Sequence, residues 1–513
     1  MKNKCLTVLV VLNLLVGAKE QLNAQIVSKD EATAVARTWI AVIAKKFGDW
    51  GGSKQASVQS VREFTRGSRQ LGYLIDVGPS GCIVVSLRKE FVPISAYSTS
   101  SRLDPASDVG MADVIKLSAE RDLNAVDMKV GPAKTASTSS VIQLFETDNR
   151  PRWSSLLTGT ILEDQSVKNR QRVADYIEGT WLLTTSWHQH WPFNAECPDK
   201  GCRETDQEGH ATVGCIATAA AQIMRYFCWP PYKTRDLGLG LFEWTNTPYD
   251  WANMPDTAKD HPPGEQVMAV ATLCSDVGVR AGMDYGCGNS DTWMYNPTPV
   301  GRSNMLSAFK SLGYESDGDY EIRGFQSSDD WFALLKFNLN ANRPLQYSIR
   351  WYQDGTFELS GHSMVCDGWH DTNGKYIHLN YGWNSGDDWW YEVGSIGKSN
   401  NTEAEAVLKN IRPINAVGPW VEDRVYDVPY YKYRNFDRSA TGHAAEFAAG
   451  QKLHFIPGVS LKNSSQGSDV IKFYGWSDRP TIIFTRGTES RGIHLMSGHI
   501  YLYSDGSFRF PKR

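Results

Sequence analysis

The sequence predicts an α+β protein of about three domains. Its 513 residues exceed what a single hydrophobic core usually organises. In the central part, helical patterns over residues 264–277 and 303–312 come before a series of short strand patterns. The strand patterns cover residues 344–349, 361–367, 376–381 and 390–393. Helices followed by antiparallel strands are the order typical of an α+β domain.

The N-terminus predicts a secretory signal peptide. A basic start at Lys2 and Lys4 is followed by a short apolar run that ends at Ala18, and small residues lead to Ala24. These are the parts of a cleavable leader. Because the apolar run is too short to span a bilayer comfortably, we expect residues 1–24 to be removed. The remaining protein is expected to be secreted, extracellular or at the cell surface, without a membrane span.

Residues 25–130 predict a compact α+β unit. A capping box at Ser28 and Glu31 begins a helix. One face of this helix is apolar and comprises Ala32, Val35, Trp39, Val42 and Ile43. Two alternating runs, residues 72–77 and 81–86, flank a Gly-Pro-Ser turn and predict a β-hairpin.

Three further regions differ in composition. Residues 131–180 begin with small polar residues and carry basic side chains, as segments that proteases nick often do, so they predict a linker or processing region. Residues 181–414 are dense in aromatic residues and hold the candidate chemistry. Residues 415–513 alternate like strands and predict a small, β-rich accessory domain.

Composition excludes some classes of partner. Lys and Arg number 53 and Asp and Glu number 57, so the net charge is only −4, which argues against a nucleic-acid or anionic-membrane binder. Cys197 and Cys202 predict a small-loop disulfide in an oxidising compartment. A zinc knuckle is the weaker alternative, because no further ligands follow at the required spacing, and we expect no metal.

A strongly helical run begins at Cys215. Gly214 allows a sharp turn into the helix, and alanine and unbranched residues dominate the run from Cys215 to Tyr226. Since the first N–H groups of a helix lack partners and its dipole is positive there, we expect a lowered pKa for the Cys215 thiol. For this stretch alone, a small buried cysteine is an equally good interpretation.

A cysteine nucleophile also needs an imidazole, a group that fixes the ring, and donors for the oxyanion. His362 lies at the start of a strand about 150 residues downstream, a separation typical of papain-like enzymes. A structural histidine is the competing interpretation. Asn380 lies near the end of the next strand, where its amide is expected to accept the ring N–H, and Trp383 is expected to shield that contact from water.

Together these motifs resemble the streptopain family of secreted bacterial cysteine peptidases. The resemblance extends over residues 25–414, in order. It rests on Gly214–Ala219, Ala221–Met224, Asp276–Gly278, Met283–Gly286, Gly361-His362, Asp367-Gly368 and Asn380–Trp383. In the N-terminal unit, residues 81–86 and 96–100 look like the family's inhibitory propeptide.

The resemblance implies a papain-like peptidase domain preceded by an α+β propeptide. The small all-β domain expected over residues 415–513 has no streptopain counterpart. It implies a zymogen that cleaves protein or peptide substrates without a cofactor, with its own propeptide as intramolecular inhibitor. Cys215 matches the nucleophile, His362 the general acid and base, and Gln189 the glutamine that helps to form the oxyanion hole. The alternatives are a cell-wall Cys/His amidase and a non-catalytic binding protein on a peptidase scaffold. One departure is Tyr381, where streptopain has tryptophan.

Overall fold

The structure is a computed structural model that describes residues 26–130, 148–160 and 176–413 with short internal gaps, and separate strands between residues 430 and 509. The predicted signal peptide and most of the predicted linker lie outside the described residues. None of the described helices is both long and apolar enough to cross a membrane.

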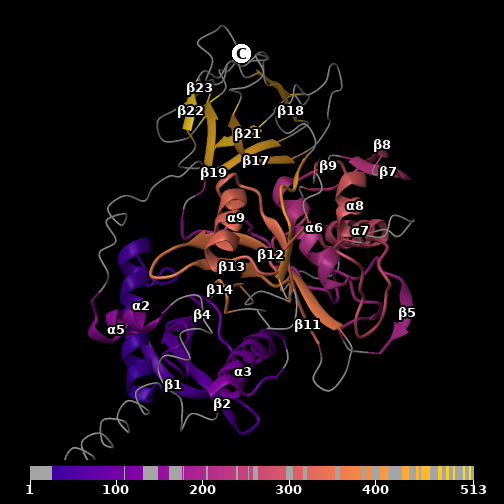
Figure 1. The fold of residues 1–513 in the computed structure, drawn as a ribbon. Helices are drawn as coiled ribbons and strands as arrows, with labels where there is room; N and C mark the ends of the chain where they lie inside the picture. Colours follow the sequence, from indigo (N-terminus) through magenta and orange to yellow (C-terminus); the bar gives the residue numbers. More distant parts are fainter. Residues whose placement is uncertain are drawn as a thin grey trace, which may run out of the picture.

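Ten of the described strands form one antiparallel sheet that runs from the N-terminal unit into the central region (Figure 1). Its strands, in spatial order, are β1 (Ser57–Arg66), β2 (Arg69–Gly78), β3 (Cys82–Ser86), β4 (Ile94–Ser98), β14 (Asp388–Glu392), β13 (Tyr376–Asn380), β12 (Leu359–His370), β11 (Leu345–Tyr352), β15 (Glu405–Leu408) and β10 (Tyr320–Ile322). The hairpin and the four central strands predicted from the sequence are therefore confirmed, and the fold is α+β.

The two parts of the sheet join where β4 pairs with β14. Tyr97 lies opposite Trp390 and Ala96 lies opposite Tyr391 in this antiparallel pair. On one face of the sheet, Trp39 of the first helix packs against Tyr97 and also against Tyr376 of β13. The N-terminal unit and the central region thus share both backbone pairing and a buried aromatic cluster.

The N-terminal unit carries α2 (Lys29–Phe47), which begins at the predicted Ser28–Glu31 capping box and buries the predicted apolar face. Helix α3 (Gly110–Val130) follows the sheet strands and was not predicted. A further helix, α5 (Arg150–Thr158), lies within the predicted processing region. It packs beside α2 (Figure 1).

The central region carries the nucleophile-candidate helix α6 (Cys215–Phe227), packed against β12 and against α7. The other helices are α7 (Glu265–Ala281), α8 (Met305–Ser311) and α9 (Ser328–Asn340). Helices α6, α7 and α8 agree with the predictions, although α7 continues beyond Val277. Helix α9 was missed, even though Ser327 caps it by accepting a hydrogen bond from the N–H of Asp330.

Smaller strand pairs complete the description. In the central region they are β5 (Asp199–Cys202) with β6 (Gly209–His210), β7 (Tyr232–Gly238) with β8 (Leu241–Pro248), and β9 (Tyr314–Glu315) with β16 (Arg412–Pro413). The described residues after 430 form β17 (Tyr430–Asp437), β18 (Glu446–Ala449), β19 (Lys452–Lys462), β20 (Lys472–Gly475), β21 (Thr481–Phe484), β22 (Glu489–Arg491), β23 (Tyr501–Leu502) and β24 (Phe508–Arg509).

Candidate active site

Cys215 is the first residue of α6, and a glycine makes that position possible. Gly214 has a φ of 86°, and a Cβ atom there would lie 2.7 Å from the carbonyl oxygen of Ser290. Any larger residue would be strained and would clash with backbone. The side-chain amide of Gln346 donates to the carbonyl of Ile216 at 2.9 Å, which fixes the first turn of α6 against β11. The thiol is therefore held at a defined helix start.

The thiol of Cys215 lies against the strand that carries His362. The backbone N–H of Ser363, the next residue along β12, interacts with the sulfur, as does that of Ile216. Burial nevertheless raises the pKa of Cys215 to about 11, and the charge of Asp291 adds to this effect. The expectation of a lowered pKa is wrong for this covered state, because loss of hydration outweighs the helix N-terminus. Cys215 is a neutral thiol here.

His362 is buried on β12, and its ring is fixed by a backbone carbonyl. Its Nε2 lies 2.8 Å from the carbonyl oxygen of Tyr381. Since a carbonyl only accepts, Nε2 carries the proton of the neutral ring and Nδ1 is the basic nitrogen. Burial lowers the pKa of His362 to about 4. In this state the thiol and the imidazole are both neutral.

The structure corrects the expected role of Asn380. Its amide does not accept the His362 N–H, since Tyr381 supplies that acceptor. Instead, Asn380 Nδ2 donates to the carbonyl of Thr185 at 2.7 Å, and its Oδ1 accepts from the N–H of Gly382 at 3.1 Å. Asn380 therefore stabilises the turn that contains the Tyr381 carbonyl, and it has no direct hydrogen bond to the His362 ring.

Two aromatic rings cover the imidazole. The Trp383 ring centre lies 4.1 Å from that of His362, tilted by 36°. The Tyr381 ring stacks on His362 at 5.3 Å with an angle of 16° between the planes. Trp383 thus lies against the His362 ring, although the Asn380 contact that it was expected to shield is not formed, and the tyrosine that departs from the streptopain motif stacks on the histidine.

Gln189 lies in the loop that leads to α6. Its backbone carbonyl accepts from the N–H of Val213 at 2.9 Å, two residues before Cys215. This bond brings the segment of Gln189 alongside the start of the nucleophile helix.

One buried residue beside these groups was missed by the sequence prediction. Gln222 is fully buried on α6, and it exchanges hydrogen bonds with Asn380 and accepts one from the N–H of Trp187. The signal was visible: a long amide side chain stands in an otherwise apolar stretch of helix between Ala221 and Ile223. Buried polar side chains are rare unless they are hydrogen-bonded.

The disulfide prediction was wrong. Cys202 pairs with Cys287, 85 residues away, and not with Cys197. The Cys197 thiol is buried, and burial raises its pKa to about 12. A close sequence spacing does not decide the partner, because a disulfide requires the two Cα atoms to approach within about 7 Å in the fold. The bond ties the β5–β6 hairpin to the loop that precedes Ser290.

The N-terminal unit reaches this site through α3. A Cβ atom at Gly110, the first residue of α3, would lie 3.6 Å from the ring of Trp383. Met111 follows Gly110 in α3, and its sulfur contacts the hydroxyl of Tyr391 on β14. The beginning of α3 therefore lies close to the tryptophan that covers His362.

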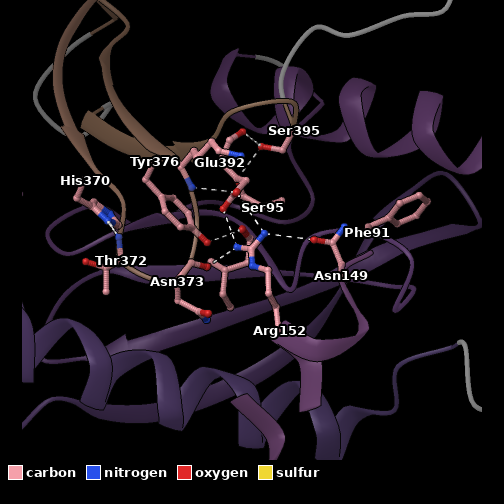
Figure 2. Close-up of polar contacts among 12 residues, drawn as sticks. Phe91, Ser95, Asn149, Arg152, His370, Thr372, Asn373, Tyr376, Glu392 and Ser395 are labelled. Carbon is pink, nitrogen blue, oxygen red and sulfur yellow. Dashed lines mark hydrogen bonds and ion pairs between the residues drawn. The ribbon is translucent and has the colours of Figure 1, made fainter. Parts of the chain in front are cut away.

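A second contact is made by Glu392, the residue that follows Tyr391 and ends β14 (Figure 2). The guanidinium group of Arg152 on α5 donates to both carboxylate oxygens of Glu392, at 3.2 and 2.9 Å. Arg152 also donates to the carbonyl of Asn373. This bidentate pair anchors α5 to the central part of the sheet.

Within the described ranges, no group of three or more His, Cys, Asp or Glu side chains is arranged to hold a metal ion. The chemistry that the site supports is that of a thiol at a helix N-terminus and an oriented imidazole on the neighbouring strand. These are features that a papain-like cysteine peptidase requires.

Residues 187–391 match the model of the Peptidase C10 family. Streptopain of Streptococcus pyogenes serotype M1 is 30% identical over 207 residues, which cover 37% of this chain and 48% of streptopain. The thiol protease/hemagglutinin PrtT of Porphyromonas gingivalis is 27% identical over 209 residues, or 38% of this chain and 21% of PrtT. The match thus spans about half of streptopain's length, and the resemblance stated from the motifs is confirmed for this domain.

Solved structures of Prevotella intermedia proteins are also similar. A prointerpain A fragment aligns with a TM-score of 0.45 at 21% identity, covering 69% of this chain and 98% of the fragment. Active interpain A cysteine protease aligns with a TM-score of 0.35 at 26% identity, covering 44% of this chain and 93% of that structure.

Proposed function

We propose that this chain is the precursor of a secreted cysteine endopeptidase that hydrolyses peptide bonds in proteins and peptides. The observation that carries the proposal is the placement of the Cys215 thiol against the backbone of Ser363, the residue that follows His362, whose Nε2–H is held by the Tyr381 carbonyl. This arrangement leaves Nδ1 of His362 as the basic nitrogen of the ring.

In the proposed reaction, His362 Nδ1 takes the Cys215 proton and the sulfur attacks the peptide carbonyl carbon. The Gln189 side chain and the Cys215 backbone N–H donate to the oxyanion. The imidazolium then protonates the leaving amine, and a thioester to Cys215 remains. Water, deprotonated by the same Nδ1, attacks the thioester and releases the acid and the free thiol.

The N-terminal unit, residues 25–130, is proposed to be an intramolecular inhibitor. Two observations support this role: β4 extends the sheet at β14, and Gly110 lies close to Trp383, which covers His362. Residues 131–180 would then contain the maturation bond. Export through a cleaved leader at residues 1–24 and an accessory role for residues 415–513 complete the proposal.

The proposal is tested by expressing the wild-type precursor and its Cys215→Ala variant. Self-cleavage and casein hydrolysis are followed under reducing conditions, with and without an epoxide thiol inhibitor. We expect both activities in wild type only, and their loss with the inhibitor. Cys82→Ala is the matched control, because it removes a buried thiol from the N-terminal unit and should leave activity intact.

Other outcomes distinguish the alternatives. If the wild-type protein neither matures nor cleaves casein, even after an added protease has nicked residues 131–180, the peptidase proposal fails. Cleavage of peptidoglycan alone would identify a cell-wall amidase, and binding without any hydrolysis would identify a non-catalytic scaffold.

A further inference from the structure

We propose that Gln222 is a positioning residue of the peptidase site: its side-chain amide fixes the turn whose carbonyl orients His362. The role of His362 itself rests on the proposed function above. The position of the Tyr381 carbonyl does not, and it can be measured without activity.

Gln222 and Asn380 form a reciprocal amide pair. Gln222 Nε2 donates to Asn380 Oδ1 at 3.1 Å, and Asn380 Nδ2 lies 3.3 Å from Gln222 Oε1. Gln222 is fully buried and Asn380 is 3% exposed. In such a dry environment, each amide depends on the other for partners that water cannot replace.

The pair connects the nucleophile helix to the histidine's acceptor. Gln222 lies seven residues after Cys215 and four after Thr218, so the three share one face of α6. Asn380 Oδ1, held by Gln222, also accepts from the N–H of Gly382 and closes a tight turn. The carbonyl of Tyr381, in the middle of this turn, accepts from His362 Nε2.

The turn is pressed closely onto α6. Gly382 has a φ of +71°, and a Cβ atom there would lie 3.1 Å from Thr218 Cγ2 and 3.6 Å from Gln222 Nε2. Glycine is therefore required at this point, both for its conformation and for the close approach. Because the turn rests directly on the amide of Gln222, a change of that amide would move the Tyr381 carbonyl.

The same amide reaches the loop that leads to Gln189. Gln222 Oε1 accepts from the N–H of Trp187 at 3.2 Å, and Asn380 Nδ2 donates to the carbonyl of Thr185 at 2.7 Å. Gln222 thus contacts the oxyanion loop and the histidine turn while it belongs to the nucleophile helix. One side chain sets the spacing of all three catalytic segments.

The test compares Gln222→Met, which keeps the side-chain length but cannot hydrogen-bond, with Gln222→Glu, which keeps acceptors and loses the donor to Asn380. After maturation, we expect kcat of Gln222→Met to fall about 10- to 100-fold with KM within about threefold. The acid limb of the kcat/KM pH profile should shift, since the ring loses part of its fixed acceptor. Gln222→Glu should fall between this variant and wild type.

A control separates positioning from stability. Asn338 is a buried residue on α9, and its side-chain oxygen accepts a hydrogen bond from the N–H of Asn410. Both residues are far from Cys215 in the chain. Asn338→Leu should lower the melting temperature about as much as Gln222→Met, yet leave kcat and the pH profile unchanged. If Gln222→Met keeps the wild-type kcat and pH profile, Gln222 has no positioning role.

A second readout does not need activity. In the Cys215→Ala precursor with ¹⁵N-labelled histidine, the Nε2–H of His362 should give a slowly exchanging proton signal, because Tyr381 accepts it. In the Cys215→Ala/Gln222→Met protein, we expect that signal to shift or to exchange at least about tenfold faster. An unchanged signal would overturn the inference even if the wild-type enzyme were active, and a changed one would support it even if no peptidase activity were found.

Discussion

Strand β12 carries two buried histidines that face different parts of the molecule. His362 lies beside α6, covered by Tyr381 and Trp383. His370, at the other end of the strand, lies among aromatic rings from both the central region and the N-terminal unit: Trp39, Phe47, Tyr97, Tyr376 and Trp390. Burial lowers the pKa of His362 to about 4 and that of His370 to about 3.

The two rings differ in what holds them. His362 is fixed by the carbonyl of Tyr381, which belongs to its own domain. His370 Nε2 pairs with the hydroxyl of Tyr97 on β4, at 2.8 Å (Figure 2 shows His370 beside Thr372). Removal of the N-terminal unit would therefore leave the orientation of His362 intact, whereas His370 would lose the Tyr97 hydroxyl and keep only the Thr372 N–H on Nδ1. The His362 ring is therefore already oriented before maturation, whereas the surroundings of the His370 ring depend on whether the N-terminal unit is bound.

The largest expected effect separates these two histidines. His362→Ala should reduce peptidase activity of the matured enzyme by about 10⁴-fold or more, because it removes the proposed acid and base. His370→Ala in the matured enzyme should change activity less than about threefold, since the ring lies at the opposite end of β12. Initial rates of casein and peptide hydrolysis measure both. Comparable losses in the two variants would mean that the two ends of the strand are not functionally distinct.

The second prediction concerns the thiol before and after maturation. With a pKa of about 11, only about one Cys215 in 10⁴ is ionised at pH 7 in the precursor. Removal of the N-terminal unit admits water to the pair and favours thiolate and imidazolium. We expect alkylation of Cys215 by iodoacetamide to become at least about 100-fold faster, as measured by mass spectrometry.

Cys274 provides the internal reference for that experiment. It is fully buried on α7, and burial raises its pKa well above the usual value. Its alkylation should stay slow in both forms of the protein. Equal rates for Cys215 before and after maturation would show that the N-terminal unit does not control the ionisation of the thiol.

The sequence predicted what depends on local pattern. The α6 helix from Cys215, the Ser28 cap and the hairpin after Leu71 were found because periodicity and turn residues determine them within a few neighbours. The beginning of α3 at Gly110 was missed, since its apolar face becomes clear only against the sheet that it covers.

The sequence could not predict which residues that are far apart in the chain become hydrogen-bond or disulfide partners. Asn380 was placed correctly beside the histidine strand, but its choice of Gln222 over His362 depends on how closely the turn approaches α6. The partner of Cys202 is 85 residues away, and only the fold brings it near. The pKa of Cys215 likewise depends on what covers the helix start, which a local pattern does not contain.

The third prediction concerns the ion pair between Arg152 of α5 and Glu392 of β14. Arg152→Met removes the partner of both Glu392 oxygens and leaves a largely buried carboxylate, so the free energy of unfolding should fall by about 3 kcal/mol. Urea unfolding of the Cys215→Ala precursor measures this. Arg150, two residues earlier, pairs with Asp148 at the surface, and Arg150→Met should leave the free energy of unfolding nearly unchanged. Similar losses for both would show that the α5 anchor is not buried in solution.

The smallest expected effect is a pH dependence of docking. The pKa of His370 is about 3 when it is buried, and it should return to about 6.5 when the ring is exposed. The released state therefore binds the extra proton, so docking is strongest above about pH 6.5 and weakens as the pH falls toward 3. At pH 5 the N-terminal unit should be held about 30-fold more weakly than at pH 7.5.

The charged groups around the ring do not cancel this effect. Lys46 on α2 opposes protonation of His370, and Asp371 favours it. Asp371 is itself paired with Lys336 and lies near Lys46, so its influence is partly compensated. Burial is the main cause of the lowered pKa, and it disappears on release.

Measurement uses the Cys215→Ala protein nicked within residues 131–180. Release of the N-terminal fragment is followed by size-exclusion chromatography between pH 7.5 and 5. His370→Phe keeps a ring in the aromatic cluster but cannot titrate, and it leaves the Tyr97 hydroxyl without its partner. This variant should dock more weakly at pH 7.5 and lose most of the pH dependence. If its docking falls with pH as steeply as that of the parent protein, carboxylates elsewhere in the interface, and not His370, determine the response.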